Sequence, residues 1–101
     1  MLLTTAVLIN VDYEILGVVI GNKVRAVHVG KDIMAFLKNL VGGEVKEYSE
    51  LMKKVRQAAM DEMIEEAKKL GANGIIGIQF ASSQIAGGMA EIIAYGTAIK
   101  I

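Results

Sequence analysis

The chain has 101 residues, which is enough for one domain with a single modest core. It contains no cysteine, so disulfides, thiolate metal sites and thiol catalysis are excluded, and its net charge of zero argues against a nucleic-acid partner. Its hydrophobic fraction of 53% and mean hydropathy of +0.46 are high for so short a chain.

Charged residues are concentrated in the middle of the chain. Sixteen of them lie between Lys31 and Lys69, whereas residues 1–30 and 70–101 carry only a few. A monomer of this size has too little charged surface to cover so much uncharged strand. We therefore expect the chain to associate with copies of itself.

The uncharged run from Leu70 to Ala90 is long enough to span a membrane. It contains five glycines and several polar amides and hydroxyls, which make it a poor spanning helix. No basic residue precedes the apolar stretch at the N-terminus, so no secretory signal is apparent. We expect a soluble, cytoplasmic protein with no membrane partner.

The first third of the chain predicts strands followed by a short helix. Met1–Ile9 is short and apolar and indicates either a small edge strand or an arm that lies on a neighbour. Tyr13–Val29 is rich in strand-forming residues, and its break at Gly21-Asn22 indicates either a hairpin or one strand with a bulge. Asp32 is a suitable N-cap for a first helix over Ile33–Val41.

A second, long helix is predicted from a start between Glu44 and Ser49 to an end at Leu70. Lysines in its last turn face the negative end of the helix dipole, and Gly71 follows where a positive φ is needed. One apolar stripe runs along the helix and consists of Tyr48, Met52, Val55, Ala59, Met63, Ala67 and Leu70.

Two further strands are predicted over Asn73–Ser83 and Met89–Ile101, joined by a turn at Gln84–Gly88. The last strand has one face of mostly small residues, which allows close approach of a helix, and one face of larger residues, which needs another cover. The order β–α–α–β–β with one right-handed crossover predicts a two-layer α+β unit. The last strand then lies between the other two and is antiparallel to both.

A set of short motifs occurs in a specific order and spacing along nearly the whole chain. They are Thr4-Thr5, Ile15-Leu16-Gly17-Val18-Val19 with Gly21, Asp32, Val41-Gly42-Gly43, Tyr48 with Met52 and Arg56, Leu70-Gly71-Ala72-Asn73, Ile75-Ile76-Gly77 and Gly96-Thr97-Ala98. In these motifs the chain resembles the YbjQ (UPF0145) family of small uncharacterised proteins, some of which are labelled as heavy-metal-binding.

The resemblance implies a single domain over residues 1–101 with the fold of a dodecin subunit. In that fold a three-stranded antiparallel sheet in the order 1-3-2 packs on a long helix. The resemblance also implies a ring-shaped homo-oligomer, a pentamer. The family brings neither established catalytic residues nor a cofactor, so none is assigned to this chain.

The chain departs from the family at two places. Members often have acidic residues in the strand after the Gly71-Ala72-Asn73 turn, whereas this chain has Ile78-Gln79-Phe80-Ala81-Ser82. The segment before the first helix, usually Asn-x-Phe-Arg-Asp, is here His28-Val29-Gly30-Lys31-Asp32. Both departures weaken the case for a metal site.

Four residues are candidates for a functional role. His28, the single histidine, is a weak metal candidate, because one imidazole alone is a poor chelate. Its copies in a ring could bind an ion together if they met on the ring axis. A structural role at a strand end or an interface is favoured. Tyr48 and Arg56 project from adjoining sides of the long helix, where Arg56 would pair with a carboxylate across an interface or hold an anion. Glu66, at the edge of the apolar stripe, needs a partner if buried, and Arg56 of a neighbouring subunit is the predicted one.

Two clusters on the same helix also have a simpler explanation. The acidic cluster of Asp61, Glu62, Glu65 and Glu66 would bind a hard cation or act as acid and base. All of its members except Glu66 lie on the side opposite the apolar stripe, which predicts a solvated face. The methionines at 52, 60 and 63 would bind a soft metal such as Cu(I), but at helical spacing they are more often core residues.

Three hypotheses of function follow. The first is a non-enzymatic, ring-forming homo-oligomer that binds a small ligand or ion in its channel or between subunits. The second is a protein that binds or buffers metal ions. The third, which we favour least, is an enzyme with an active site between subunits.

Overall fold

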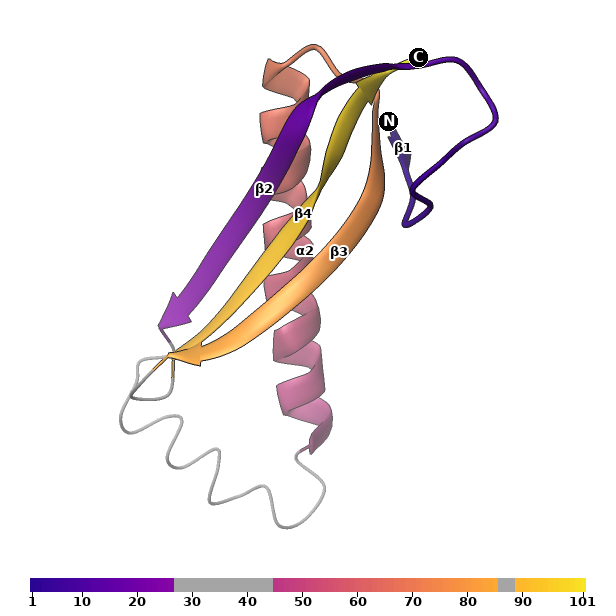
Figure 1. Cartoon of the computed structure of the whole chain (residues 1–101). Coiled ribbons are helices and arrows are strands. Elements are labelled where there is room, and N and C mark those ends of the chain that lie inside the picture. The colour runs from indigo at the N-terminus through magenta and orange to yellow at the C-terminus, as the bar shows by residue number, and fades with distance from the viewer. Residues whose placement is uncertain (27–44, 86–88) are drawn as a thin grey trace.

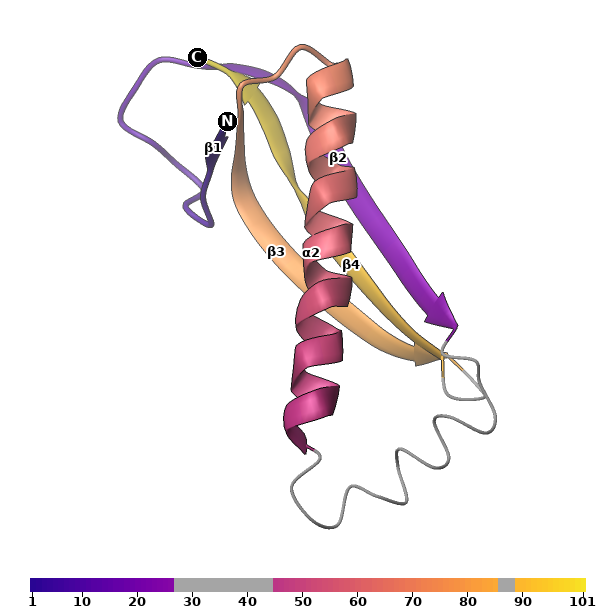
Figure 2. The same cartoon turned by 180° about the vertical axis from the view of Figure 1, so that it is seen from behind.

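The computed structural model describes residues 1–26, 45–85 and 89–101, in which one face of a sheet is covered by a long helix (Figure 1; Figure 2). The sheet has the strand order β1-β3-β4-β2. Its strands are β1 (Leu2–Leu3), β2 (Glu14–Ala26), β3 (Gly74–Ile85) and β4 (Met89–Lys100), and the helix is α2 (Val45–Lys69). β4 is antiparallel to both of its neighbours, whereas β1 is parallel to β3.

The expected three-stranded antiparallel sheet in the order 1-3-2 is wrong, because the N-terminal residues add a fourth strand and make the sheet mixed. Leu2 and Leu3 pair in parallel with the first two residues of β3. The chain then stays beside β3 as far as Ala6, whose carbonyl accepts a hydrogen bond from the Gly77 N–H at 2.7 Å. The α+β class is as predicted. For the N-terminal segment the sequence indicated either an edge strand or an arm on a neighbour, and the structure shows the edge strand.

The stretch predicted over Tyr13–Val29 forms one strand in its described part, β2, and not a hairpin. Its pairing with β4 continues through Gly21-Asn22 without a shift in register. The irregularity lies instead between Ile15 and Gly17, near the start of the strand. The glycine at position 21 is therefore required for a reason other than a turn.

That reason is the contact between β2 and α2. A Cβ atom at Gly21 would overlap the carbonyl oxygen of Ala59 and would lie 2.6 Å from the backbone nitrogen of Met63. Only glycine lets the helix backbone come this close to the strand. Gly21 therefore sets the distance between the two layers.

The end of α2 confirms the predicted helix boundary and its glycine stop. The helix ends at Lys69, and Gly71 has a φ of 82°. The Ala72 N–H donates to the Ala67 carbonyl and the Gly71 N–H donates to the Lys68 carbonyl, both at 3.0 Å. This is the Schellman pattern, which satisfies the last carbonyls of the helix and turns the chain directly into β3.

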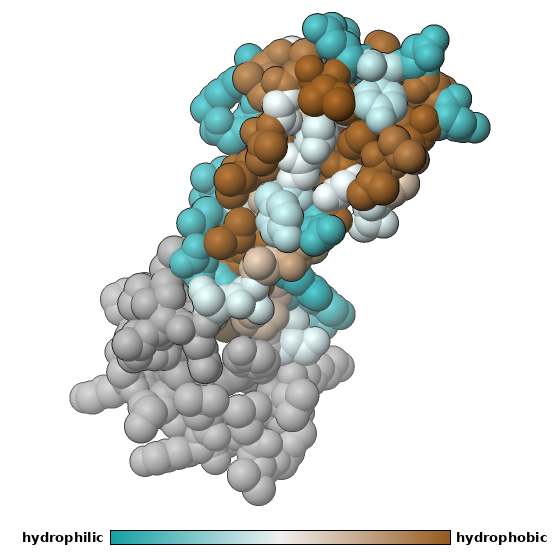
Figure 3. Space-filling model, viewed as in Figure 1, coloured by the Kyte–Doolittle hydropathy of each residue, from teal (hydrophilic) through white to brown (hydrophobic). Residues whose placement is uncertain are grey.

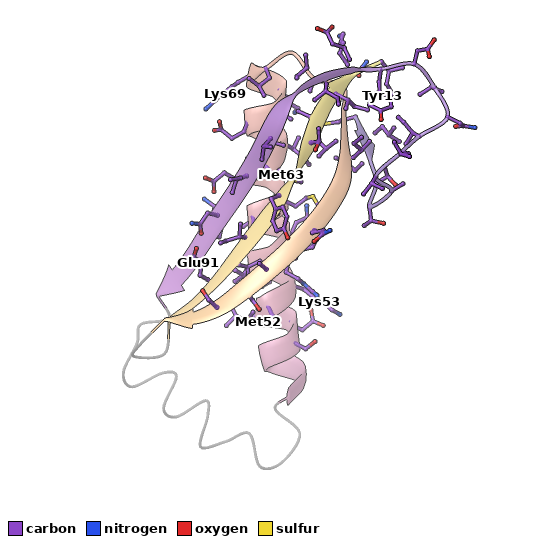
Figure 4. The ribbon with its side chains drawn as sticks, viewed as in Figure 1. Tyr13, Met52, Lys53, Met63, Lys69 and Glu91 are labelled. Carbon is purple, nitrogen blue, oxygen red and sulfur yellow. The ribbon has the colours of Figure 1, made fainter. Side chains whose placement is uncertain are left out.

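The core lies between α2 and the helix-facing side of the sheet. Met63 and Ile75 are the largest fully buried side chains of this core, and Figure 4 labels Met63 where α2 passes behind the strands. Ile99 is equally buried, but the strand alternation places it on the opposite face of β4. Small residues of β4 lie beneath the helix, where Ala94 and Ala98 are fully buried. This confirms that the small-residue face of the last strand receives α2.

Two expectations fall on residues that the structure does not describe. The predicted first helix over Ile33–Val41 and the centre of the turn at Gln84–Gly88 lie outside the described residues. Among the described residues, no helix has the combination of length and apolar composition that crossing a membrane requires.

Candidate functional site

The face of the sheet opposite α2 is apolar, and its part along β2 is exposed in a single chain, whereas Ile76 and Ile99 on the same face are buried. Ile15, Val18 and Ile20 of β2 are 65%, 72% and 53% exposed. Val18 stands opposite Thr97 and Ile20 opposite Tyr95 in the register of β2 and β4, so these side chains share one surface. Figure 3 views the molecule from this side, where brown side chains gather over the strands. We call this surface the outer sheet face.

The polar groups of the outer sheet face are mostly uncharged. The Tyr95 hydroxyl donates a hydrogen bond to Gln79 Oε1 at 3.0 Å across β4 and β3. Among the described side chains that the strand alternation places on this face, Glu91 near the start of β4 carries the one charge. A half-exposed tyrosine within an uncharged apolar surface is typical of the centre of a protein interface.

The side of α2 next to β2 is acidic. We define the acidic flank as Asp61, Glu62, Glu65 and Glu66, which line a groove of about 450 Å³ together with Lys23 and Lys69. Lys69 Nζ donates to Glu66 Oε1 at 3.0 Å, and Lys23 Nζ lies 3.4 Å from Glu62 Oε2. Four carboxylates thus face two ammonium groups along this groove, and Lys68 Nζ, outside the groove lining, lies 3.5 Å from Glu65 Oε1.

Glu62 differs from the solvated residue that the sequence predicted. Its side chain is 39% exposed, but its Oε2 atom has almost no exposed surface and makes no hydrogen bond in the structure. The nearby Lys23 ammonium supplies charge compensation without hydrogen-bond geometry. Such partly exposed ion pairs contribute about 0–1 kcal/mol each to stability.

The opposite side of α2, next to β3, is basic and partly apolar. We define the basic flank as Lys53 and Arg56, which line a groove of about 390 Å³ with Gln57, Met60 and Phe80. Arg56 is exposed and makes no ion pair with the residues that the structure describes, whereas Lys53 Nζ lies 3.8 Å from a Glu50 carboxylate oxygen. Phe80 is 44% exposed at the floor of this groove.

The predicted site residues are not brought together within one chain. Arg56 lies on the basic flank and Glu66 on the acidic flank, where Glu66 is half-buried. Tyr48 lies in α2, but its side chain is outside the described part of the structure, as is the whole of His28. Sequence reasoning missed Phe80, whose signal is an aromatic residue in the middle of an otherwise small and polar strand end.

The described residues do not form a metal centre. No three of their histidine, cysteine, aspartate or glutamate side chains are grouped closely enough to hold an ion. The methionines of α2 belong to the core, since Met63 is fully buried and Met52 and Met60 pack against the buried cluster. The thioether groups are therefore used for packing.

A family model described as "Putative heavy-metal-binding" (YbjQ_1) matches the chain over residues 1–101. The chain belongs to the UPF0145 (YbjQ) family. A UPF0145 protein of Archaeoglobus fulgidus is 57% identical over 88 residues, which are 87% of this chain and 82% of the relative. A UPF0145 protein of Helicobacter hepaticus is 52% identical over 90 residues, 89% of this chain and 87% of the relative.

The fold also occurs in a solved structure. A crystal structure of a protein of unknown function from Pediococcus pentosaceus, described as belonging to the DUF74 family, superposes with a TM-score of 0.68. The match covers 100% of this chain and 97% of the other at 22% identity. At that identity, the likeness shows the shared fold.

The heavy-metal-binding description of the UPF0145 family does not fit the described residues of this chain. Soft metal ions are bound by thiolate, thioether and imidazole groups. The chain has no cysteine and one histidine, and the three methionines of α2 pack in or against the core. We therefore derive no metal chemistry from this site.

Proposed function

We propose that the protein is a non-enzymatic subunit of a ring-shaped homo-oligomer, a pentamer, which buries the outer sheet face between copies and binds a small ligand or ion where subunits meet. The observation that supports this proposal is the exposed apolar surface of Ile15, Val18 and Ile20. Antiparallel sheets that face water on one side usually carry alternating polar residues there. This face instead has the composition of a contact surface.

A second copy of the chain is the partner that suits this surface best. The described outer sheet face is almost free of charge, so a neighbouring copy can pack against it without like-charge repulsion. β2 is also an edge strand of 13 residues, and such edges are usually covered by pairing with another strand or element. Closed symmetric homo-oligomers are the commonest way to cover such surfaces.

The position of a ligand follows from the shape of the grooves. The grooves of about 390 and 450 Å³ on the two flanks of α2 are open to solvent in one chain. Sites for small molecules usually enclose most of the ligand surface. A neighbouring subunit that partly covers either groove would enclose the space that remains, and we infer that a ligand binds there, between copies.

The proposal is tested by introducing charge on the outer sheet face. In the double variant Val18→Lys/Ile20→Lys, we expect the oligomer to dissociate, because each lysine brings a strongly hydrated ammonium group into an apolar contact. A loss of about 2 kcal/mol per site corresponds to about a 30-fold weaker contact. Light scattering after size exclusion measures the mass.

The matched control is Leu8→Lys, which changes an apolar residue that is 77% exposed in the N-terminal segment and not on the outer sheet face. We expect this variant to keep the mass of the wild type. If the double variant keeps the oligomeric mass as well, the outer sheet face is not the contact between subunits.

A further inference from the structure

We propose that neighbouring subunits meet head to tail along α2, with the acidic flank of one copy against the basic flank of the next. This inference rests on the homo-oligomer proposed above and assigns one of its contacts. It commits to a second copy of the chain as the occupant of both grooves. Figure 2 shows α2 lying across the sheet, with β2 on one side of the helix and β3 on the other.

The position of the two flanks fits a ring. The acidic flank lies beside β2 and the basic flank beside β3, and β4 separates these two strands in the sheet. A contact between two different surfaces of the same chain is heterologous, and repeating it produces a closed ring when the rotation allows closure. A contact of either flank with itself would instead place like charges together.

The charges of the two flanks are complementary. The acidic flank presents four carboxylates with two ammonium groups, whereas Lys53 and Arg56 dominate the other groove. Arg56 is exposed and has no ion-pair partner among the described residues, and the side chains of Glu62 and Glu66 are 39% and 46% exposed. The planar guanidinium group of arginine binds carboxylates with two parallel hydrogen bonds, so it suits these acceptors.

Apolar side chains accompany the charges on both flanks. Phe80 is 44% exposed on the basic flank, and Ile20 and Leu70, which line a groove with Glu62 and Glu66, are 53% and 48% exposed. Docking would bury these side chains together with the ion pairs. Charged pairs that lose their contact with water affect dissociation more strongly than pairs at an exposed rim.

The positions along the helix restrict how neighbours are oriented. At about 1.5 Å per residue, Arg56 lies about 9 Å from Glu62 and about 15 Å from Glu66 along the helix axis. In a ring, Arg56 of one copy and Glu62 or Glu66 of the next lie at the same height along the ring axis only if the helices are inclined to that axis. Glu62 requires the smaller inclination and Glu66 the larger, so the residue that pairs with Arg56 reports the inclination.

Charge reversal with rescue tests this contact. We expect Arg56→Glu alone to weaken the oligomer by about tenfold or more, because it places a carboxylate against the acidic flank. Adding Glu62→Arg or Glu66→Arg to the same chain should restore the mass to that of the wild type, since every copy then carries the exchanged pair. Native mass spectrometry over a dilution series measures the dissociation, and far-UV circular dichroism verifies the fold.

Lys54→Glu is the matched control, because it makes the same charge reversal at an exposed position of α2 that lines neither flank groove. We expect it to leave the dissociation unchanged. The proposal is overturned if the wild type is oligomeric and Arg56→Glu has no larger effect than this control. It is also overturned if Arg56→Glu weakens the oligomer and neither exchange rescues it. If Arg56→Glu then also abolishes binding of inorganic phosphate, the basic flank holds a free anion and not a neighbouring carboxylate. A monomeric wild type would instead contradict the homo-oligomer itself.

Discussion

Replacing Gly21 with alanine is expected to destabilise the protein by about 3 kcal/mol or more, at or above the upper end of the range for overpacked cores. The added Cβ would overlap the backbone of Ala59 and lie 2.6 Å from the backbone nitrogen of Met63. Backbone atoms within a helix cannot rotate away as a side chain does. The whole of α2 would have to move off β2, with loss of packing along the core.

Gly71→Ala is the matched control for this substitution. Gly71 has a φ of 82°, but a Cβ there would meet no atom within 4 Å. The cost is therefore limited to the backbone strain of a left-handed alanine, about 1–2 kcal/mol. Urea denaturation at one fixed protein concentration compares the two, since oligomerisation makes apparent stability depend on concentration. Equal losses in both variants would show that β2 and α2 are not in backbone contact at Gly21.

Truncating Met63 to alanine is expected to cost about 2–5 kcal/mol, the range for deleting a large buried aliphatic side chain. Met63 has no exposed surface and is one of the three largest side chains that are fully buried. The cavity lies between α2 and the sheet, where the surrounding small residues cannot fill it. Thermal and urea unfolding measure the change in the free energy of unfolding.

Met52→Ala provides the comparison on the same helix. Met52 is half-buried and packs at the border of the core cluster, so we expect a clearly smaller loss of stability. Both losses should be the same with and without a chelator, because the methionines act as packing residues. A loss for Met63→Ala that disappears in chelator would instead indicate that a bound metal ion stabilises the wild type.

Local signals in the sequence predicted the second half of the fold well. The lysines of the last helical turn and Gly71 located the end of α2 within one residue, because capping depends on a few neighbouring positions. The alternation of small and large residues identified the face of β4 that receives the helix, where Ala94 and Ala98 are fully buried. Both features depend on residues that are close together in the chain.

The features that sequence reasoning missed depend on contacts between distant segments. Two residues, Leu2 and Leu3, are too short a strand to show any periodicity, and their pairing with β3 joins positions more than 70 residues apart. At Gly21-Asn22 the sequence indicates either a hairpin or a bulge within one strand, and the structure shows neither there. A glycine required by a nearby helix has the same local sequence as one required by a turn, so only the tertiary structure separates the two.

The functional roles of the candidate residues stay predictions, and only their positions around the helix can be compared with the structure. The sequence identified Arg56 and Glu66 as residues at the edges of the helical stripe, and the structure places them on opposite flanks of α2. Periodicity gives the angle of a residue around a helix, but it does not say which strand lies on which side. The pairing of Lys23 with Glu62 and the exposure of Phe80 therefore required the structure.

The mass of the wild-type protein in solution is the most direct test of the account. Native mass spectrometry of the full chain at micromolar concentration should show one closed homo-oligomer, a pentamer, because the outer sheet face and both flanks of α2 are then covered. A stable monomer at the same concentration, with Ile15, Val18 and Ile20 open to water, would contradict it.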